Sequence, residues 1–180
     1  MPRKPREEEA GAVQHVYARG NNKQRIFLRD GDRAKYLGLL GDVVERSRWR
    51  CLSYCLMDNH VHLMLETTLP NLGEGMQWLH GHYGTWLNEI HARVGHVFQG
   101  RFGAVRMKSE GQLWAAAAYI ARNPVDAGLC ELPEEWAWSS HRFVLEGDGP
   151  SWLDVDRLLW HFSGVGADPR SVYGRVTGGV

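Results

Sequence analysis

Two strand-like segments separated by two residues constrain the fold of this chain most strongly. Residues 50–57 read RCLSYCLM and residues 60–66 read HVHLMLE. The Asp58-Asn59 pair between them is typical of a tight turn between antiparallel strands. The pattern therefore predicts a β-hairpin at the centre of the chain.

The second of these segments carries two kinds of side chain in alternation. Because successive side chains on a strand point to opposite faces, Val61 and Leu63 face one side while His60 and His62 face the other. Two imidazoles at this spacing start about 6 to 7 Å apart, close enough to converge on one metal ion. The alternative is a pair of half-buried histidines that bond to their neighbours, and the His-x-His pattern alone does not decide between the two.

The remaining periodicities complete an α+β pattern. They predict a strand at 13–20, a helix capped by Asp32, a helix after Pro70, one or two strands within 96–108, a helix capped by Ser109 and stopped by Pro124, and a short helix at 154–161. The order β-α-β-β-α-β-α is typical of a ferredoxin-like antiparallel sheet with helices packed on one side.

The length of 180 residues indicates one domain with an appended tail. We expect a flexible arm at 1–12, a catalytic domain at 13–145, and a partly helical tail at 146–180. No apolar run is long enough to span a membrane, and the first residues do not resemble a secretory signal. Three cysteines, two of them four residues apart on one expected strand, favour reduced thiols and a cytoplasmic protein.

The net charge is zero, but the charges are unevenly distributed. Residues 1–50 carry 12 Lys and Arg against 7 Asp and Glu, residues 51–108 carry 4 against 4, and residues 109–180 carry 5 against 10. A neutral total therefore leaves room for a polyanion on the first half, although scattered solvated charges explain the pattern equally well. The candidate nucleic-acid contacts are Arg19, Asn21, Asn22, Lys23, Gln24, Arg25, Arg101, Arg106 and Lys108.

A second chemical pair lies on the helix expected after Ser109. Tyr119 and Asn123 are four residues apart, so they project from the same helix face. An amide oxygen could complete a two-histidine metal site, and a phenol beside that site could act as a nucleophile on a phosphate. The alternative is an ordinary tyrosine on a helix flank and an asparagine that ends a helix before proline.

Five segments in order resemble the single-tyrosine HUH transposases, and in particular their branch of REP-associated tyrosine transposases. They are HVYARGNNKQRIF, MDNHVHLMLE, GHVFQGRFGAVRMK, AAYIARNPVDAGL and WAWSSH, which together span about residues 13–145. The resemblance implies that His60 and His62 are the paired histidines, that Tyr119 is the catalytic tyrosine, and that Asn123 is the third metal ligand. Asp126 departs from the pattern, because the family often has a basic residue there.

The resemblance also implies an activity and its partners. Such enzymes bind Mg²⁺ or Mn²⁺ and cut single-stranded DNA beside hairpins, which leaves a 5′-phosphotyrosine and a free 3′-hydroxyl. They act as monomers or as homodimers. Two alternatives are a hairpin-binding protein that no longer cuts DNA, and a rolling-circle replication initiator or relaxase; the short length and the YIARNP segment favour the transposase.

Overall fold

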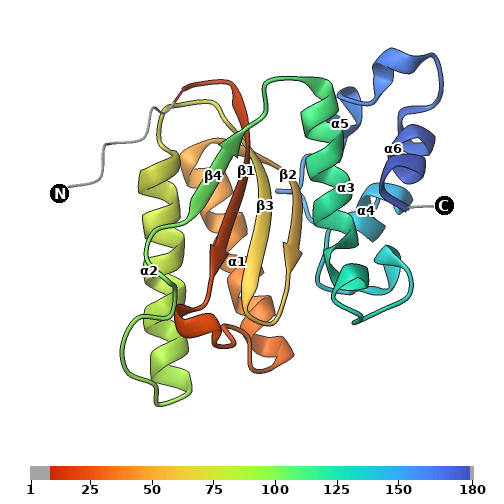
Figure 1. Ribbon diagram of the computed structural model, residues 1–180. Helices are drawn as coiled ribbons and strands as arrows, with labels where there is room; N and C mark the ends of the chain where they lie inside the picture. Colours follow the sequence, from red (N-terminus) through yellow and green to blue (C-terminus); the bar gives the residue numbers. More distant parts are fainter. Residues whose placement is uncertain (1–8, 179–180) are drawn as a thin grey trace.

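The computed structural model describes residues 9–178 and is built on a four-stranded antiparallel sheet (Figure 1). The strand order is β2-β3-β1-β4, with β1 at Ala12–Arg19, β2 at Trp49–Leu56, β3 at His60–Thr67 and β4 at Gly103–Arg106. The predicted hairpin and the predicted α+β class are both confirmed. Of the expected N-terminal arm, residues 1–8 lie outside the described residues.

Helices cover both faces of this sheet, so the expectation of helices on one side is wrong. The helices are α1 (Asp30–Ser47), α2 (Leu72–Ile90), α3 (Glu110–Asp126), α4 (His141–Glu146), α5 (Val155–Trp160) and α6 (Pro169–Gly178). Short 3-10 turns lie at Asn21–Lys23, Pro133–Glu135 and Ser163–Val165. α1 and α2 pack on one face, and α3 with the C-terminal helices gathers on the other face at the β2 side (Figure 1).

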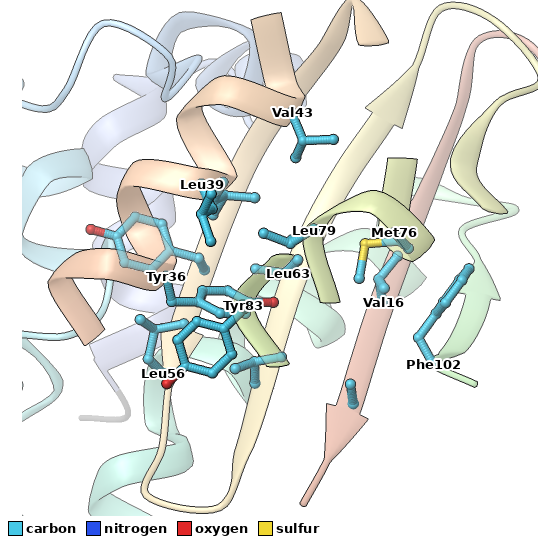
Figure 2. Close-up of a cluster of buried hydrophobic side chains, with 14 of the residues drawn as sticks. Val16, Tyr36, Leu39, Val43, Leu56, Leu63, Met76, Leu79, Tyr83 and Phe102 are labelled. Atoms are coloured by element: carbon cyan, nitrogen blue, oxygen red, sulfur yellow. The ribbon is translucent and has the colours of Figure 1, made fainter. Parts of the chain in front are cut away.

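The face under α1 and α2 forms the larger hydrophobic core. Leu63 of β3 is fully buried there, together with Val16 of β1, Leu79 and Tyr83 of α2, and Val43 of α1 (Figure 2). Each such aliphatic side chain contributes about 1.5–3 kcal/mol by leaving water. This core holds β3 against the helices and leaves the opposite strand face for other groups.

A β-bulge in β2 directs some of its side chains into a second hydrophobic core on the other face of the sheet. Cys51 pairs with Leu65 and Ser53 pairs with Met64, so Leu52 is the extra residue between them. The inserted residue shifts the alternation, and Cys51 and Cys55 therefore lie in different cores on opposite faces of the sheet. All three cysteines are free thiols, as predicted.

The second core joins α3 to the C-terminal helices. Ile120 of α3 and Met64 of β3 pack with Phe162 and Tyr173, all of them buried. The predicted short helix is confirmed as α5, and the Asp154 carboxylate caps its start by accepting the N–H of Arg157 at 2.9 Å. This packing seals the β2 side of the second face and leaves the β1 and β4 side more open.

Helix α1 begins two residues before the predicted cap. Asp32 is the third residue of the helix, and its carboxylate accepts the backbone N–H groups of Leu28 at 2.8 Å and Arg29 at 3.1 Å. A carboxylate at this position satisfies backbone donors as a capping box does, which is why the sequence pattern placed the start slightly too late.

Helix α3 starts where the sequence predicted but ends later. The Ser109 hydroxyl accepts the N–H of Gln112, whereas Pro124 lies within the helix and does not stop it. Only the last turn follows this proline, and the Asn123 carbonyl still accepts the N–H of Ala127 at 3.1 Å. A proline so near a helix end removes few backbone bonds, so Asn123 keeps its helical direction.

The predicted strand at 96–108 is mostly loop. Only Gly103–Arg106 pairs with β1, and a single bridge joins Phe98 to Gly20. Within residues 9–178, no helix has the length and apolar character needed to cross a membrane.

Candidate active site at the start of strand β3

The turn before β3 is held firmly to the segment that leads into α1. The Asp58 carbonyl accepts the N–H groups of Ile26 at 2.9 Å and Phe27 at 3.1 Å, and the Asp58 carboxylate pairs with Arg33 and with Arg25. Because both the backbone and the side chain of this residue are tied down, the next residues of β3 start from a fixed position.

The two histidines of β3 meet an asparagine of α3. Their ring centres lie 5.0 Å apart. Nε2 of His60 lies 3.0 Å from Oδ1 of Asn123, and Nε2 of His62 lies 3.4 Å from Nδ2 of the same amide. Both Nε2 atoms therefore point at one carboxamide group.

The phenol of α3 lies one turn away from this amide. The ring centre of Tyr119 is 5.2 Å from that of His62 and 5.8 Å from that of His15. The residue is 49% exposed, so a large substrate can reach its hydroxyl. The structure thus brings together all four side chains that the sequence predicted for the catalytic site: His60, His62, Tyr119 and Asn123.

Two residues of β1 also belong to this site, and sequence reasoning missed both. Nε2 of His15 lies 2.9 Å from Nδ1 of His62, and the Tyr17 ring centre lies 6.4 Å from that of His62. Gly103 of β4 makes room for Tyr17, because a Cβ atom there would lie 2.1 Å from the tyrosine ring. The available signal was the alternation of β1, which places His15, Tyr17 and Arg19 on one face.

The imidazoles of the site are neutral near pH 7. Burial lowers the pKa of His60 and of His15, and burial with the neighbouring histidines lowers the pKa of His62 to about 3. A neutral imidazole keeps one nitrogen lone pair free, which is the form that binds metal ions.

The position of the free lone pair on His60 follows from Asn59. Nδ2 of Asn59 donates to the Lys23 carbonyl at 3.0 Å, so its Oδ1 is the atom that faces Nδ1 of His60 at 2.7 Å. An amide oxygen only accepts hydrogen bonds. Oδ1 of Asn123 also faces this ring, 3.0 Å from Nε2, but Oδ1 of Asn59 is closer and the Lys23 carbonyl fixes its orientation, so we place the proton of His60 on Nδ1. Its Nε2 then carries the lone pair.

This assignment leaves two acceptor atoms facing each other. The Nε2 lone pair of His60 and the Oδ1 atom of Asn123 are 3.0 Å apart, with no proton between them. A cation bound by both atoms would replace this repulsion with attraction. Two imidazole nitrogens and an amide oxygen suit a divalent cation that accepts mixed nitrogen and oxygen ligands, so the residues present fit such an ion.

The third donor is unusual for a protein metal site. Among residues 9–178, no three His, Cys, Asp or Glu side chains gather in a way that could hold a metal ion. The set of His60, His62 and Asn123 depends on a neutral amide instead. It adds no negative charge that would offset the charge of a bound cation.

Several candidate nucleic-acid contacts lie beside this site. Arg19 ends β1 directly opposite His60, and the turn Asn21–Lys23 follows it. The loop that contains Arg101 lies close by, because the N–H of Gln99 donates to the Arg19 carbonyl at 2.8 Å. Arg25 is partly engaged with Asp58 at 3.2 Å.

The other basic candidates lie at the far end of the sheet. Arg106 pairs with Gln14, five residues before Arg19 on β1, which is a distance of about 17 Å along the strand. Its guanidinium forms an ion pair with Glu9, and Lys108 follows it at the start of the loop into α3. The structure does not bring Arg106 and Lys108 to the histidines.

The fold defines the first level of classification. A solved structure described as the REP-associated tyrosine transposase bound to a REP hairpin superimposes with a TM-score of 0.67, at 15% sequence identity, over 83% of this chain and 89% of that one. A second structure, described as a "putative transposase" from Deinococcus radiodurans, gives 0.47 at 14% identity, over 62% of this chain and 90% of that one. The first superposition confirms the predicted α+β fold.

The sequence then places the chain in a family. The profile of the family described as "Transposase IS200 like" matches residues 11–123, which is more than half of the chain. This protein belongs to the IS200-like transposase family. A search of curated proteins found no significant match.

Proposed function

We propose that this protein cuts and rejoins single-stranded DNA beside hairpin-forming repeats, with Tyr119 as the nucleophile. The observation that carries the proposal is the convergence of an accessible phenol, two imidazoles and a carboxamide at one end of the sheet. Membership of a transposase family supports DNA as the substrate class.

The proposed cleavage is a transfer of one phosphoryl group. The phenolic oxygen of Tyr119 forms a bond to phosphorus while the bond from phosphorus to the 3′ oxygen of the preceding nucleotide breaks. The phenol loses a proton and the departing 3′ oxygen gains one, so the step is neutral in protons and electrons. The products are a 5′-phosphotyrosine and a free 3′-hydroxyl, which can later attack the same linkage to rejoin DNA.

The remaining side chains prepare the phosphate for this attack. His60, His62 and Asn123 would hold Mg²⁺ or Mn²⁺, which when bound supplies Lewis-acid polarisation of a phosphoryl oxygen. Their own contribution is geometric, because β3 and α3 fix the imidazoles and the amide against one another. Tyr119 lies one helical turn from Asn123, and this proximity supports its role as the nucleophile on a phosphate bound at the three ligands.

Hairpin DNA is the partner that fits this surface. The similar solved structure is described as bound to a REP hairpin. In this chain, Arg19, Lys23 and Arg25 lie around the start of β3, where they can contact phosphates on either side of the cleavage point. We propose that the protein acts as a monomer or as a homodimer.

A covalent-adduct assay tests the proposal. The protein is incubated with Mn²⁺ and 3′-labelled oligonucleotides that carry a hairpin beside a single-stranded segment, and denaturing gels detect labelled DNA attached to protein. We expect an adduct with the natural chain and none with Tyr119→Phe. Tyr17→Phe is the matched control, because this half-exposed tyrosine faces the same site.

The outcomes separate the competing functions. An adduct that persists in Tyr119→Phe and disappears in Tyr17→Phe would reassign the nucleophile to β1. Tight binding of hairpin DNA without cleavage, across divalent cations and flanking sequences, would show a hairpin-binding protein instead.

A further inference from the structure

A neutral imidazole binds a metal ion through the one nitrogen that carries a lone pair. The hydrogen bond made by the other nitrogen determines which of the two that is. When a neighbour accepts a proton from Nδ1, the lone pair is left on Nε2. Both site histidines direct Nε2 at Asn123, so the groups that contact their Nδ1 atoms determine whether that direction is chemically useful.

Asn59 makes this contact for His60. Its amide bridges two segments, since Nδ2 donates to the Lys23 carbonyl and Oδ1 accepts from Nδ1 of His60 at 2.7 Å. The carbonyl of Lys23 lies in the turn after β1, where Asn22 and Lys23 both have positive φ angles of 51° and 58°. This turn geometry orients the Asn59 amide, which in turn orients His60.

His15 makes the corresponding contact for His62. Its Nε2 atom lies 2.9 Å from Nδ1 of His62, on the neighbouring strand. On the other side of the ring, Nδ2 of Asn123 is the nearest donor to Nε2 of His62, at 3.4 Å. A ring that donates from Nδ1 and accepts at Nε2 satisfies both neighbours, whereas the opposite tautomer would set a proton against the amide hydrogens.

We infer that Asn59 and His15 are positioning residues that hold His60 and His62 with the proton on Nδ1 and the lone pair on Nε2. The inference rests on the proposed function, which gives these lone pairs a ligand to bind. It adds two residues that contact neither the phosphate nor the cation directly, and it assigns one to each histidine.

The tautomers themselves are the first test. In protein with ¹⁵N-labelled histidine and no added metal, long-range ¹H–¹⁵N spectra distinguish Nδ1–H from Nε2–H rings. The chain has nine histidines, so His60→Gln and His62→Gln serve to assign the two signals. We expect both rings as Nδ1–H in the natural chain. An Nε2–H ring at His60 would overturn the positioning role of Asn59, and an Nε2–H ring at His62 would overturn that of His15.

Cation affinity is the second test, measured by Mn²⁺ titration followed by electron paramagnetic resonance. Loss of an outer partner of a metal-bound histidine weakens binding by about 10–100-fold, so we expect this loss for Asn59→Leu and for His15→Leu. His15→Gln keeps an accepting oxygen and should recover most of the affinity, whereas Asn59→Asp keeps the acceptor but loses the donor to the Lys23 carbonyl and should recover only part of it. His82→Leu is the control, since His82 is exposed on α2, where its ring lies beside Trp78 of the same helix and its Nδ1 faces the Trp78 carbonyl.

The two tests separate this inference from the proposed function. If His60→Ala weakens Mn²⁺ binding but Asn59→Leu and His15→Leu do not, the positioning roles are wrong and the metal site stands. If Mn²⁺ does not bind the natural chain, the metal part of the proposed function fails, while the ¹⁵N spectra still decide the tautomers. Folding of each variant is checked by urea unfolding.

Discussion

The two faces of β3 share one backbone but have opposite surroundings. On one face, Val61, Leu63 and Leu65 are fully buried under α1 and α2. On the other, His60 and His62 meet α3 and the side chains of β1 at the edge of a second, smaller core. The first face stabilises the fold, and the second uses the rigidity that the first provides.

The difference shows how a polar site can be buried without loss of the fold. His62 is 6% exposed, yet each of its ring nitrogens has a partner, one on β1 and one on α3. Buried polar groups are tolerated when they are hydrogen-bonded in this way. The site therefore depends on neighbours from two other elements, whereas the apolar face depends on volume and area.

The largest expected difference between the two faces comes from replacing one residue on each. Leu63→Ala should lower the free energy of unfolding by about 2–5 kcal/mol, because it leaves a cavity in the larger core. His62→Leu should cost less, about 1–2 kcal/mol, because it leaves Nε2 of His15 and Nδ2 of Asn123 without their partner but buries an apolar side chain. Urea unfolding measures both, and equal losses would contradict the division of roles between the faces.

The turn that joins the two strands should respond next. Asp58→Asn leaves the guanidinium of Arg33, whose side chain is 6% exposed, without its closest carboxylate. We expect a loss of about 1–3 kcal/mol, reduced from the value for a fully buried pair because Asp58 is itself 43% exposed.

A matched control uses the other carboxylate near this arginine. Asp30 is 78% exposed and lies 3.4 Å from Arg33, so Asp30→Asn should cost no more than about 0.5 kcal/mol. If Asp30→Asn costs as much as Asp58→Asn in urea unfolding, then the ion pair between Asp58 and Arg33 does not stabilise the turn more than the exposed pair does.

A histidine behind the apolar face links stability to pH. Burial lowers the pKa of His80 to about 3, and the residue stacks on Phe98 and contacts the Tyr36 hydroxyl. Below pH of about 6.5 the unfolded chain binds a proton there that the folded chain does not. The contribution of neutral His80 to the free energy of unfolding is therefore fully present above pH of about 6.5 and is lost as the pH falls toward 3.

His80→Gln tests this contribution. Relative to the variant, the natural chain should lose about 2 kcal/mol more stability between pH 7.5 and pH 5, at about 1.4 kcal/mol per pH unit. Urea unfolding at the two pH values measures the difference, and His82→Gln controls for exposed histidines on the same helix. An unchanged pH dependence in His80→Gln would show that His80 does not set it.

The smallest effect concerns the two ends of β1 as contacts for DNA. Arg19→Gln, beside the histidines, should remove about one phosphate contact and flatten the dependence of log Kd on log salt by about 0.7–1. Arg106→Gln, at the far end and paired with Glu9, should leave the slope unchanged. Hairpin-oligonucleotide binding at several salt concentrations measures both. Equal flattening in the two variants would mean that DNA covers the whole strand, and no flattening in Arg19→Gln would mean that Arg19 does not contact DNA.

Much of the fold could be predicted because it depends on local patterns. The alternation in 60–66 and the Asp58-Asn59 turn predicted the hairpin, and the Ser109 cap was confirmed as the start of α3. Helix ends were less predictable: Pro124 did not stop α3, because only its last turn follows. The bulge at Leu52 gave no sequence signal, and its effect is to place Cys51 and Cys55 in cores on opposite faces of the sheet.

The candidate site was predicted only in part. The spacing within β3 and within α3 identified His60, His62, Tyr119 and Asn123, because each pair lies on one element. The partners His15 and Asn59 were missed, because their roles depend on contacts with other segments.

By itself, the sequence determined the elements and the side chains that each one presents, since a repeat of two or about 3.6 residues is a property of the local backbone. Only the tertiary structure decided that β1 lies beside β3 with His15 in reach of His62, and that α3 packs against β2 and β3 so that Asn123 faces both imidazoles. These contacts join residues 47 to 63 positions apart, so they arise from the packing of the two cores and from no local pattern.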